Sequence, residues 1–152
     1  MLTYSAVFDN QAVTTATDIF EATVTADRPV LLMALELFQD SDLGDAAEEV
    51  LHIGLYRAVT AGATGTAVTE AAYGSADYPT ATLAVTQLRG TASTGGTNIY
   101  EIGFNIRIPT LWCPVPELRP KIAADEDPFS FRLNVAPIDS IDLSATMIWE
   151  EV

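Results

Sequence analysis

The stretch that decides the fold is Glu101-Ile102-Gly103-Phe104-Asn105-Ile106-Arg107-Ile108, in which every second residue is apolar. In an extended strand, successive side chains point to opposite faces, so the four apolar residues share one face and the others share the opposite one. The pattern predicts a strand that is buried on one side and faces solvent on the other.

Similar apolar-rich runs fill the rest of the chain and are separated by segments rich in Gly, Pro, Asp and Ser. They lie at residues 2–8, 18–26, 30–39, 49–60, 82–87, 98–108, 129–135 and 141–149. Asp9-Asn10 and the Gly-containing segments 61–66 and 90–97 are predicted to be turns and strand tips. We therefore predict an all-β fold in one domain, residues 1–152, as an antiparallel β-sandwich and in particular a jelly roll of about eight strands.

Charge excludes several classes of partner. The chain has 21 Asp and Glu residues against seven Lys and Arg, a formal net charge of −14. Binding to nucleic acid depends on Lys and Arg displacing counterions, so this class is not expected. An anionic membrane surface is excluded by the same sign argument. The apolar run 30–38 is too short to span a bilayer, which needs about 20 residues, and residues 1–5 lack the features of a secretory signal.

Few residues in the chain could perform catalysis. His52 is the only histidine, which removes multi-histidine metal sites and leaves a Ser-His-Asp triad only if His52 is its base. Cys113 is the only cysteine, so it forms no internal disulfide, and we expect it to be a small buried apolar side chain. We predict no enzyme, no catalytic residue and no cofactor.

Two segments are candidate binding sites. Asp40, Asp42 and Asp45 form an acidic cluster that could hold Ca²⁺, although the spacing does not match an EF-hand loop and a solvated acidic turn is the default. Residues 109–120 contain four prolines and cannot form an interior strand or helix, which predicts an extended strap over the surface. Within it Trp112, Pro114 and Pro116 are the candidate partner-binding residues. The strap can either fold its tryptophan underneath or present it, whereas Trp149 is expected in the core.

Several short motifs resemble those of small β-sandwich proteins encoded among the head genes of tailed bacteriophages. They are Asp18-Ile19-Phe20, Arg28-Pro29-Val30, Gln39-Asp40-Ser41-Asp42, Ala47-Glu48-Glu49, Gly103-Phe104-Asn105-Ile106-Arg107, Pro116-Glu117-Leu118-Arg119-Pro120, Phe131-Arg132-Leu133 and Trp149-Glu150-Glu151. The resemblance implies a jelly-roll capsid decoration, or cement, protein that sits as homotrimers on the head. It further implies the major capsid protein as partner, the capsid exterior of the virion as location, and synthesis in the host cytoplasm. Many such proteins dock through an N-terminal arm, whereas here a predicted strand begins at residue 2.

Two other hypotheses remain open. A carbohydrate- or receptor-binding module of a virion would use Trp112, Tyr56, Tyr73 or Tyr78 as stacking platforms and the acidic loop to hold Ca²⁺. A hydrolase would need paired carboxylates such as Asp40, Asp42 or Asp125 across a cleft. The first predicts glycan binding, the second predicts turnover, and decoration predicts neither.

Overall fold

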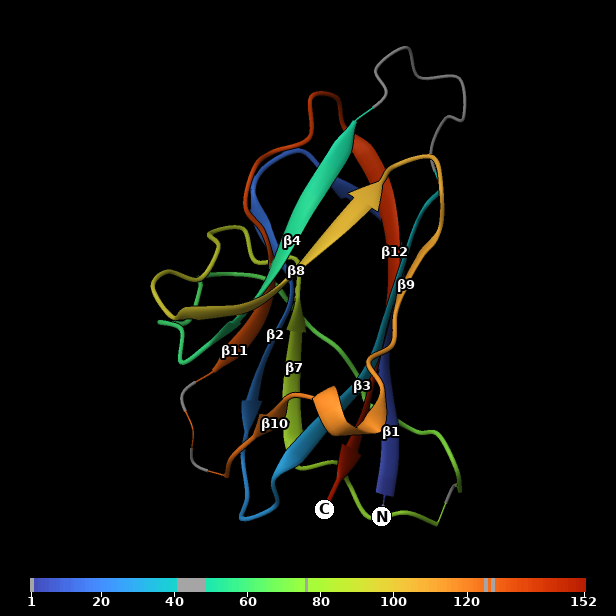
Figure 1. Cartoon of the computed structure of the whole chain (residues 1–152), viewed down its shortest axis with the longest axis vertical. Helices are drawn as coiled ribbons and strands as arrows, with labels where there is room; N and C mark the ends of the chain where they lie inside the picture. The colour runs from blue at the N-terminus through green and yellow to red at the C-terminus, as the bar shows by residue number, and fades with distance from the viewer. Residues whose placement is uncertain (1, 41–48, 76, 125, 127) are drawn as a thin grey trace.

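The structure, a computed structural model, describes residues 2–40, 49–75, 77–124, 126 and 128–152. Two antiparallel β-sheets pack face to face (Figure 1). The predicted all-β sandwich is therefore confirmed. In the described ranges no helix is long and apolar enough to cross a membrane.

The first sheet has the strand order β10-β3-β12-β1-β6, and β9 pairs with the same strand, β3, that β10 pairs with. Its strands are β1 (Leu2–Val13), β3 (Val30–Gln39), β6 (Ala71–Ala72), β9 (Thr110–Trp112), β10 (Lys121–Ile122) and β12 (Ile141–Glu151). The adjacent strands β1, β12 and β3 form its centre, so the beginning and the end of the described chain lie side by side (Figure 1).

The second sheet has the order β5-β7-β2-β11-β4-β8. Its strands are β2 (Thr17–Val24), β4 (Val50–Arg57), β5 (Thr66–Ala67), β7 (Leu83–Gln87), β8 (Thr97–Asn105) and β11 (Phe129–Leu133). Of the twelve strands in the described residues, those of five or more residues are β1, β2, β3, β4, β7, β8, β11 and β12.

The predicted inward rows meet in one core between the sheets. Phe129, Phe131 and Leu133 of β11 are buried, as is the alternate row of β12 that ends in Trp149. The row of β8 departs from the prediction at its end, because the strand stops at Asn105 and the chain turns there, which leaves Ile108 exposed.

Two strands contain bulges, one of them in place of a predicted turn. Asp9-Asn10 was expected to be a turn, but β1 continues through it, with a register shift against β12 and a positive φ of 49° at Asn10. In β2 the partners of Phe131 and Arg132 are Phe20 and Asp18, so Ile19 is an extra residue that has no partner on β11. A bulge of this kind re-aims the neighbouring side chains.

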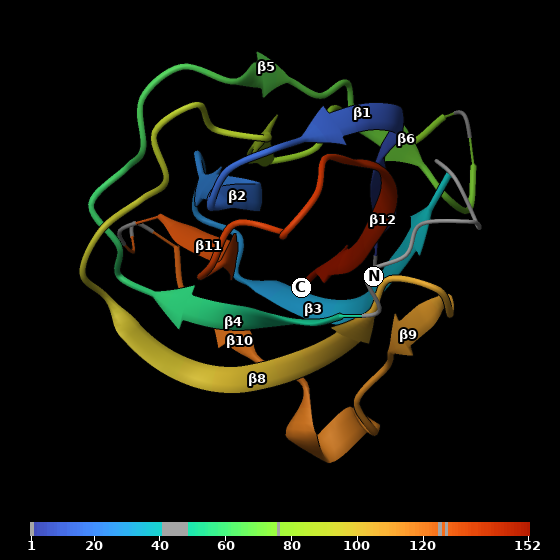
Figure 2. The same ribbon diagram turned by 90° about the horizontal axis from the view of Figure 1, so that it is seen from above.

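The outer face of the second sheet is covered by its own connections. Residues 58–65 and 88–96 run side by side, joined by the bridges Thr60–Thr94 and Ala63–Thr91, and wrap around the sheet (Figure 2). The prediction that 61–66 and 90–97 are simple strand tips is therefore wrong. The alternation of Phe20, Ala22 and Val24 with Glu21, Thr23 and Thr25 predicts that β2 is half exposed, but the covering loops leave it almost entirely buried.

Candidate functional site

An apolar groove of about 620 Å³ lies in the described surface where the two sheets meet at one edge. It is lined by Ile99 and Tyr100 of β8, Leu111 and Trp112 of β9, and Cys113, Pro114, Leu118 and Pro120 of the strap. Strand β8 ends the second sheet and β9 lies at the margin of the first, so the groove occupies the seam between them (Figure 2).

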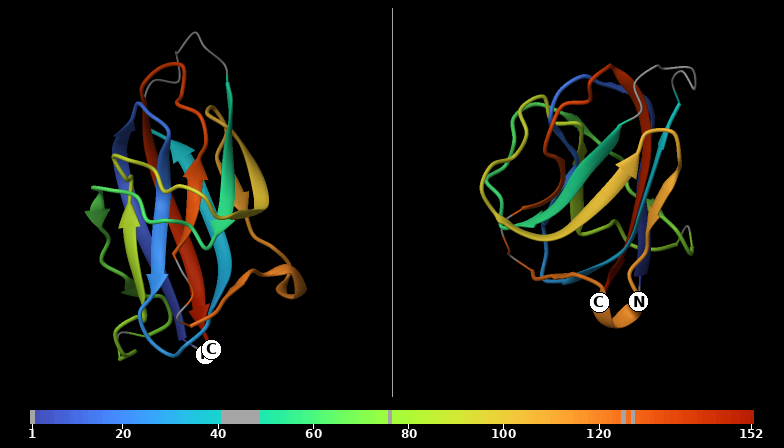
Figure 3. Two further views of the ribbon diagram at one scale, coloured as in Figure 1. Left: turned by 90° about the vertical axis from the view of Figure 1, so that its left-hand side faces the viewer. Right: turned by 45° about the horizontal axis from the view of Figure 1, so that its top comes forward.

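Local sequence explains why this seam stays open. Proline lacks a backbone N–H and fixes φ, so the strap after β9 cannot extend the three-residue pairing with β3. Instead the chain forms the 3₁₀ turn η1 (Pro116–Leu118), with Pro116 in its first position, where the missing N–H costs nothing. Figure 3 shows this turn projecting from the body of the sandwich. The segment 109–120 is therefore not extended over its whole length, as predicted, because it contains the short edge strand β9 and the 3₁₀ turn η1.

Trp112 forms the floor of the groove. Its ring contacts Tyr100 and Phe131, each with a centroid distance of 5.6 Å, and only 7% of the residue is exposed. The walls are more accessible, with Leu111 65% and Leu118 74% exposed. The strap therefore folds its tryptophan underneath and presents aliphatic side chains.

The other candidate residues divide between the groove and its surroundings. Pro114 lines the groove, whereas Pro116 begins η1 and is not among the lining residues. Cys113 was expected to be buried, but it is exposed and lines the groove, because it follows the last residue of β9.

The acidic cluster receives no support as a metal site. Asp42 and Asp45 lie outside the described residues. Asp40 follows β3, and its carboxylate, like that of Asp9 at 2.8 Å, accepts a hydrogen bond from Ser144 Oγ. Within the described ranges no group of three or more His, Cys, Asp or Glu side chains could hold a metal ion.

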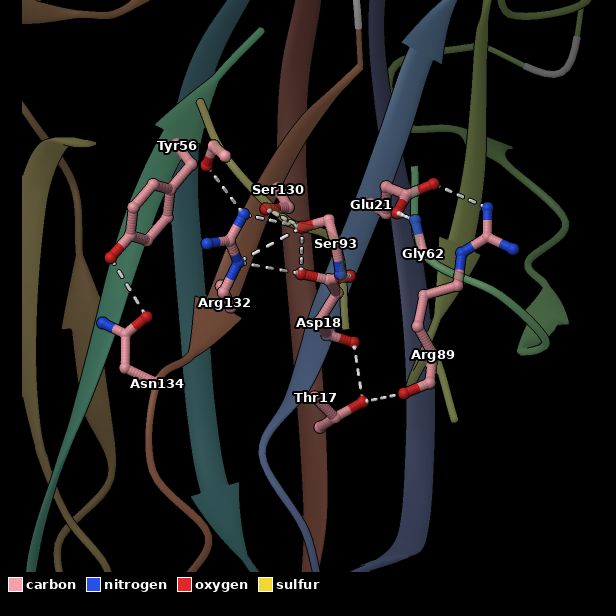
Figure 4. A network of polar contacts seen from close by, with 11 residues as sticks. Thr17, Asp18, Glu21, Tyr56, Gly62, Arg89, Ser93, Ser130, Arg132 and Asn134 are labelled. Carbon is pink, nitrogen blue, oxygen red and sulfur yellow. Dashed lines mark hydrogen bonds and ion pairs between the residues drawn. The ribbon is translucent and has the colours of Figure 1, made fainter. Parts of the chain in front are cut away.

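A buried polar network, which the sequence analysis missed, lies beneath the covering loops (Figure 4). Asp18 is fully buried and accepts hydrogen bonds from the Ser93 N–H at 2.6 Å and the Ser93 hydroxyl at 2.7 Å. Arg132 from the neighbouring strand donates to Ser93 Oγ at 3.0 Å, and its Nε lies 3.7 Å from Asp18 Oδ1. The guanidinium also stacks over Tyr56, 4.0 Å from the ring centre.

A second part of the same network holds the other loop (Figure 4). Glu21 accepts a hydrogen bond from the Gly62 N–H at 2.7 Å and pairs with Arg89 at 2.6 Å. Asp18 and Glu21 are three residues apart on a strand. Glu21 lies between the core residues Phe20 and Ala22 and therefore projects from the other face, and the extra residue Ile19 brings Asp18 to that same face, toward the loops.

This network holds the loops 58–65 and 88–96 to the second sheet, and we call it the clamp. Ser93 and Ser130, whose hydroxyls are 2.9 Å apart, are buried, and no histidine lies among its hydrogen-bonded residues. A hydroxyl nucleophile needs an adjacent base and access to substrate. The Asp18 carboxylate lies next to the Ser93 hydroxyl, but both residues are buried, so this hydroxyl is not accessible to a substrate in the described structure. The signal available in the sequence was Arg132, a cation between the core residues Phe131 and Leu133.

The expected aromatic platforms do not gather on one surface. Tyr56 stacks with Arg132 and hydrogen-bonds Asn134 at 3.0 Å, and Tyr78 packs edge-on against Tyr4. Tyr4 is buried, donates to Pro79 O at 2.7 Å and stacks on Trp149. Burial, with a smaller contribution from the Glu151 carboxylate, raises the pKa of Tyr4 above its ordinary value.

Comparison of the chain with protein-family models, curated proteins and solved structures found no match.

Proposed function

We propose that this protein binds another protein through its surface rather than transforming a substrate, and that it is a decoration protein of a phage capsid acting as a homotrimer. The observation that carries the proposal is the apolar groove on an otherwise strongly acidic molecule. Exposed apolar patches with polar surroundings mark interaction sites, and the lining residues offer little that could bind or polarise a small polar substrate.

The strand order supports the jelly-roll part of the proposal. Strands β1, β12, β3 and β9 lie in order in the first sheet, and β2, β11, β4 and β8 in the second. The chain thus passes between the sheets at β1–β2, β2–β3, β3–β4, β5–β6, β6–β7, β8–β9, β10–β11 and β11–β12. Long connections of this type between two sheets are typical of jelly rolls, and β5, β6 and β7 form an excursion within the connection from β4 to β8.

The mechanism would be thermodynamic. A protein that binds the assembled shell, and not its separated subunits, stabilises the shell by an amount set by its affinity and concentration, about 2.7 kcal/mol per site at a hundredfold excess over Kd. A trimer would add avidity, because each copy can contact a different capsid subunit. The acidic surface would keep the protein off the packaged genome.

Cosedimentation with purified heads of the encoding phage that lack this protein tests the proposal. We expect saturable binding and a higher temperature of head disruption. Leu118→Asp is expected to weaken binding, whereas Tyr73→Asp, at a residue of similar exposure outside the groove, is the matched control. Absence of binding by the wild-type protein, or glycan binding in its place, would contradict the proposal.

A further inference from the structure

Charge is distributed unevenly around the apolar groove. Four arginines of the described chain pair with carboxylates: Arg28 with Glu151, Arg57 with Glu126, Arg89 with Glu21 and Arg132 with Asp18. Arg119 and Lys121, which flank the groove residue Pro120, make no ion pair with any described carboxylate. Neither cation is a lining residue, and the exposed Glu117 is in the same way a neighbour of Leu118. A ligand with apolar side chains beside a carboxylate would match the part of the groove at Pro120, next to the two cations.

One exposed segment of this same chain has that character. The connection from β11 to β12 carries Val135, 68% exposed, and Ile138, 73% exposed, followed by the exposed residue Asp139. We call residues 134–139 the apolar loop. The two exposed aliphatic side chains lie within four residues of each other and next to a carboxylate, so together they form an apolar patch that a partner can cover.

The apolar loop is held in one conformation before any partner binds. The N–H of Ile138 donates to both carboxylate oxygens of Glu49, at 3.0 and 3.2 Å, and Pro137 is buried. At the start of the loop the Asn134 N–H donates to His52 O at 3.3 Å, and Asn134 Oδ1 accepts from Tyr56. Such preorganisation lowers the entropy cost of association.

The apolar loop and the strap lie toward opposite ends of the long axis of the molecule, so the loop cannot fill the groove of its own chain (Figures 1 and 3). A second copy can supply it. We propose that the groove of one copy receives the apolar loop of the next, with Val135 and Ile138 against Leu111 and Leu118, and Asp139 near Arg119 and Lys121.

This contact is head-to-tail, because the two surfaces that meet are different. Repeated contacts of this kind close into a ring when the rotation between copies permits and form a filament when it does not. The inference rests on the proposed function in one respect, the binding of protein by the groove, and it names a second copy as the occupant. For the proposed homotrimer it predicts a closed ring of three.

Sedimentation velocity of the full chain, without capsids, is the primary test. We expect wild-type oligomers, and for Leu118→Asp or Ile138→Asp an increase in Kd of about 30-fold or more, as for truncation of a central interface residue. Tyr73→Asp should associate like the wild type. Circular dichroism and thermal melting of each variant show whether it remains folded. A monomeric wild-type protein, or normal association of folded Ile138→Asp, would overturn the proposal.

Mixing the two variants tests the head-to-tail geometry. The Leu118→Asp chain keeps its apolar loop and the Ile138→Asp chain keeps its groove, so an equimolar mixture can form one intact contact. We expect a one-to-one heterodimer and no larger species. A mixture that stays monomeric would refute the pairing of these two surfaces.

Cys113 provides an independent readout, since it is the only cysteine and lines the groove. Its labelling by a maleimide should be slow in wild-type oligomers and fast in monomeric Ile138→Asp, and equal rates would contradict occupation of the groove. Capsid binding is measured separately. If oligomers form but do not bind heads, the decoration proposal fails alone; if monomers bind heads, only the head-to-tail contact fails.

Discussion

Replacing Asp18 by alanine should destabilise the fold severely. The change removes the acceptor for the Ser93 N–H and hydroxyl and leaves the Arg132 side chain, only 14% exposed, without its carboxylate. Removing one partner of a buried ion pair costs about 3–5 kcal/mol, because the remaining charge stays desolvated. For a domain of this size the melting temperature should fall by roughly 6–20 °C.

Urea unfolding of wild-type and variant proteins, followed by circular dichroism, measures this loss directly. The matched control is Glu126→Ala, which removes a more exposed ion pair with Arg57 and should cost less than about 1 kcal/mol. Hydrogen exchange at the Ser93 amide should accelerate in the Asp18 variant. A loss below about 1 kcal/mol for Asp18→Ala, equal to that of the control, would refute the view that this carboxylate holds the loop 88–96 to the sheet.

Two further predictions concern the second loop and the tyrosine beside the termini. Gly62→Ala should destabilise by about 1–3 kcal/mol, since the added methyl would collide with Thr91 O, whereas Gly103→Ala meets only Val50 at 3.7 Å; equal urea midpoints would contradict this. The pKa of Tyr4 is raised, so as the pH rises above about 10 the unfolded chain loses the Tyr4 proton while the native state still holds it. The free energy of unfolding is therefore retained below pH about 10 and falls as the pH rises beyond that value. Tyr4→Phe should flatten that alkaline decline in a series of melts, and an unchanged slope would refute the assignment.

Alternation in the sequence was sufficient to predict the core but not what covers the sheets. A polar side chain on the outward face of a strand gives the same pattern whether it meets water or a folded-back loop. The pattern around Glu21 therefore predicts a solvent-facing side chain, although the loop 58–65 buries it. Alternation also does not show where a strand ends. It predicts that Ile108 and Val135 point into the core, although their strands stop at Asn105 and Leu133.

The candidate site was predicted only in part, for a topological reason. The prolines of the strap predicted a segment that cannot form an interior strand or helix, and Pro114 does line the groove. The opposite wall comes from Ile99 and Tyr100, which reach the strap because β9 pairs with β3, a strand more than 70 residues earlier. A pairing between residues so far apart in the sequence cannot be predicted from a local pattern. The exposure of Cys113, which follows from that pairing, could not be predicted either.

The distribution of charge connects the clamp to the groove. Arg89 and Arg132, two of the seven Lys and Arg residues, form ion pairs with Glu21 and Asp18 beneath the loops. The excess of carboxylates therefore lies outside this network, where it repels a second acidic copy over most approaches. Such repulsion is screened beyond about 8 Å at physiological ionic strength, whereas charges in contact are screened much less. In the proposed contact, Arg119 and Lys121 would attract the Asp139 carboxylate of the second copy while apolar area is buried, and this combination would favour one contact geometry over others.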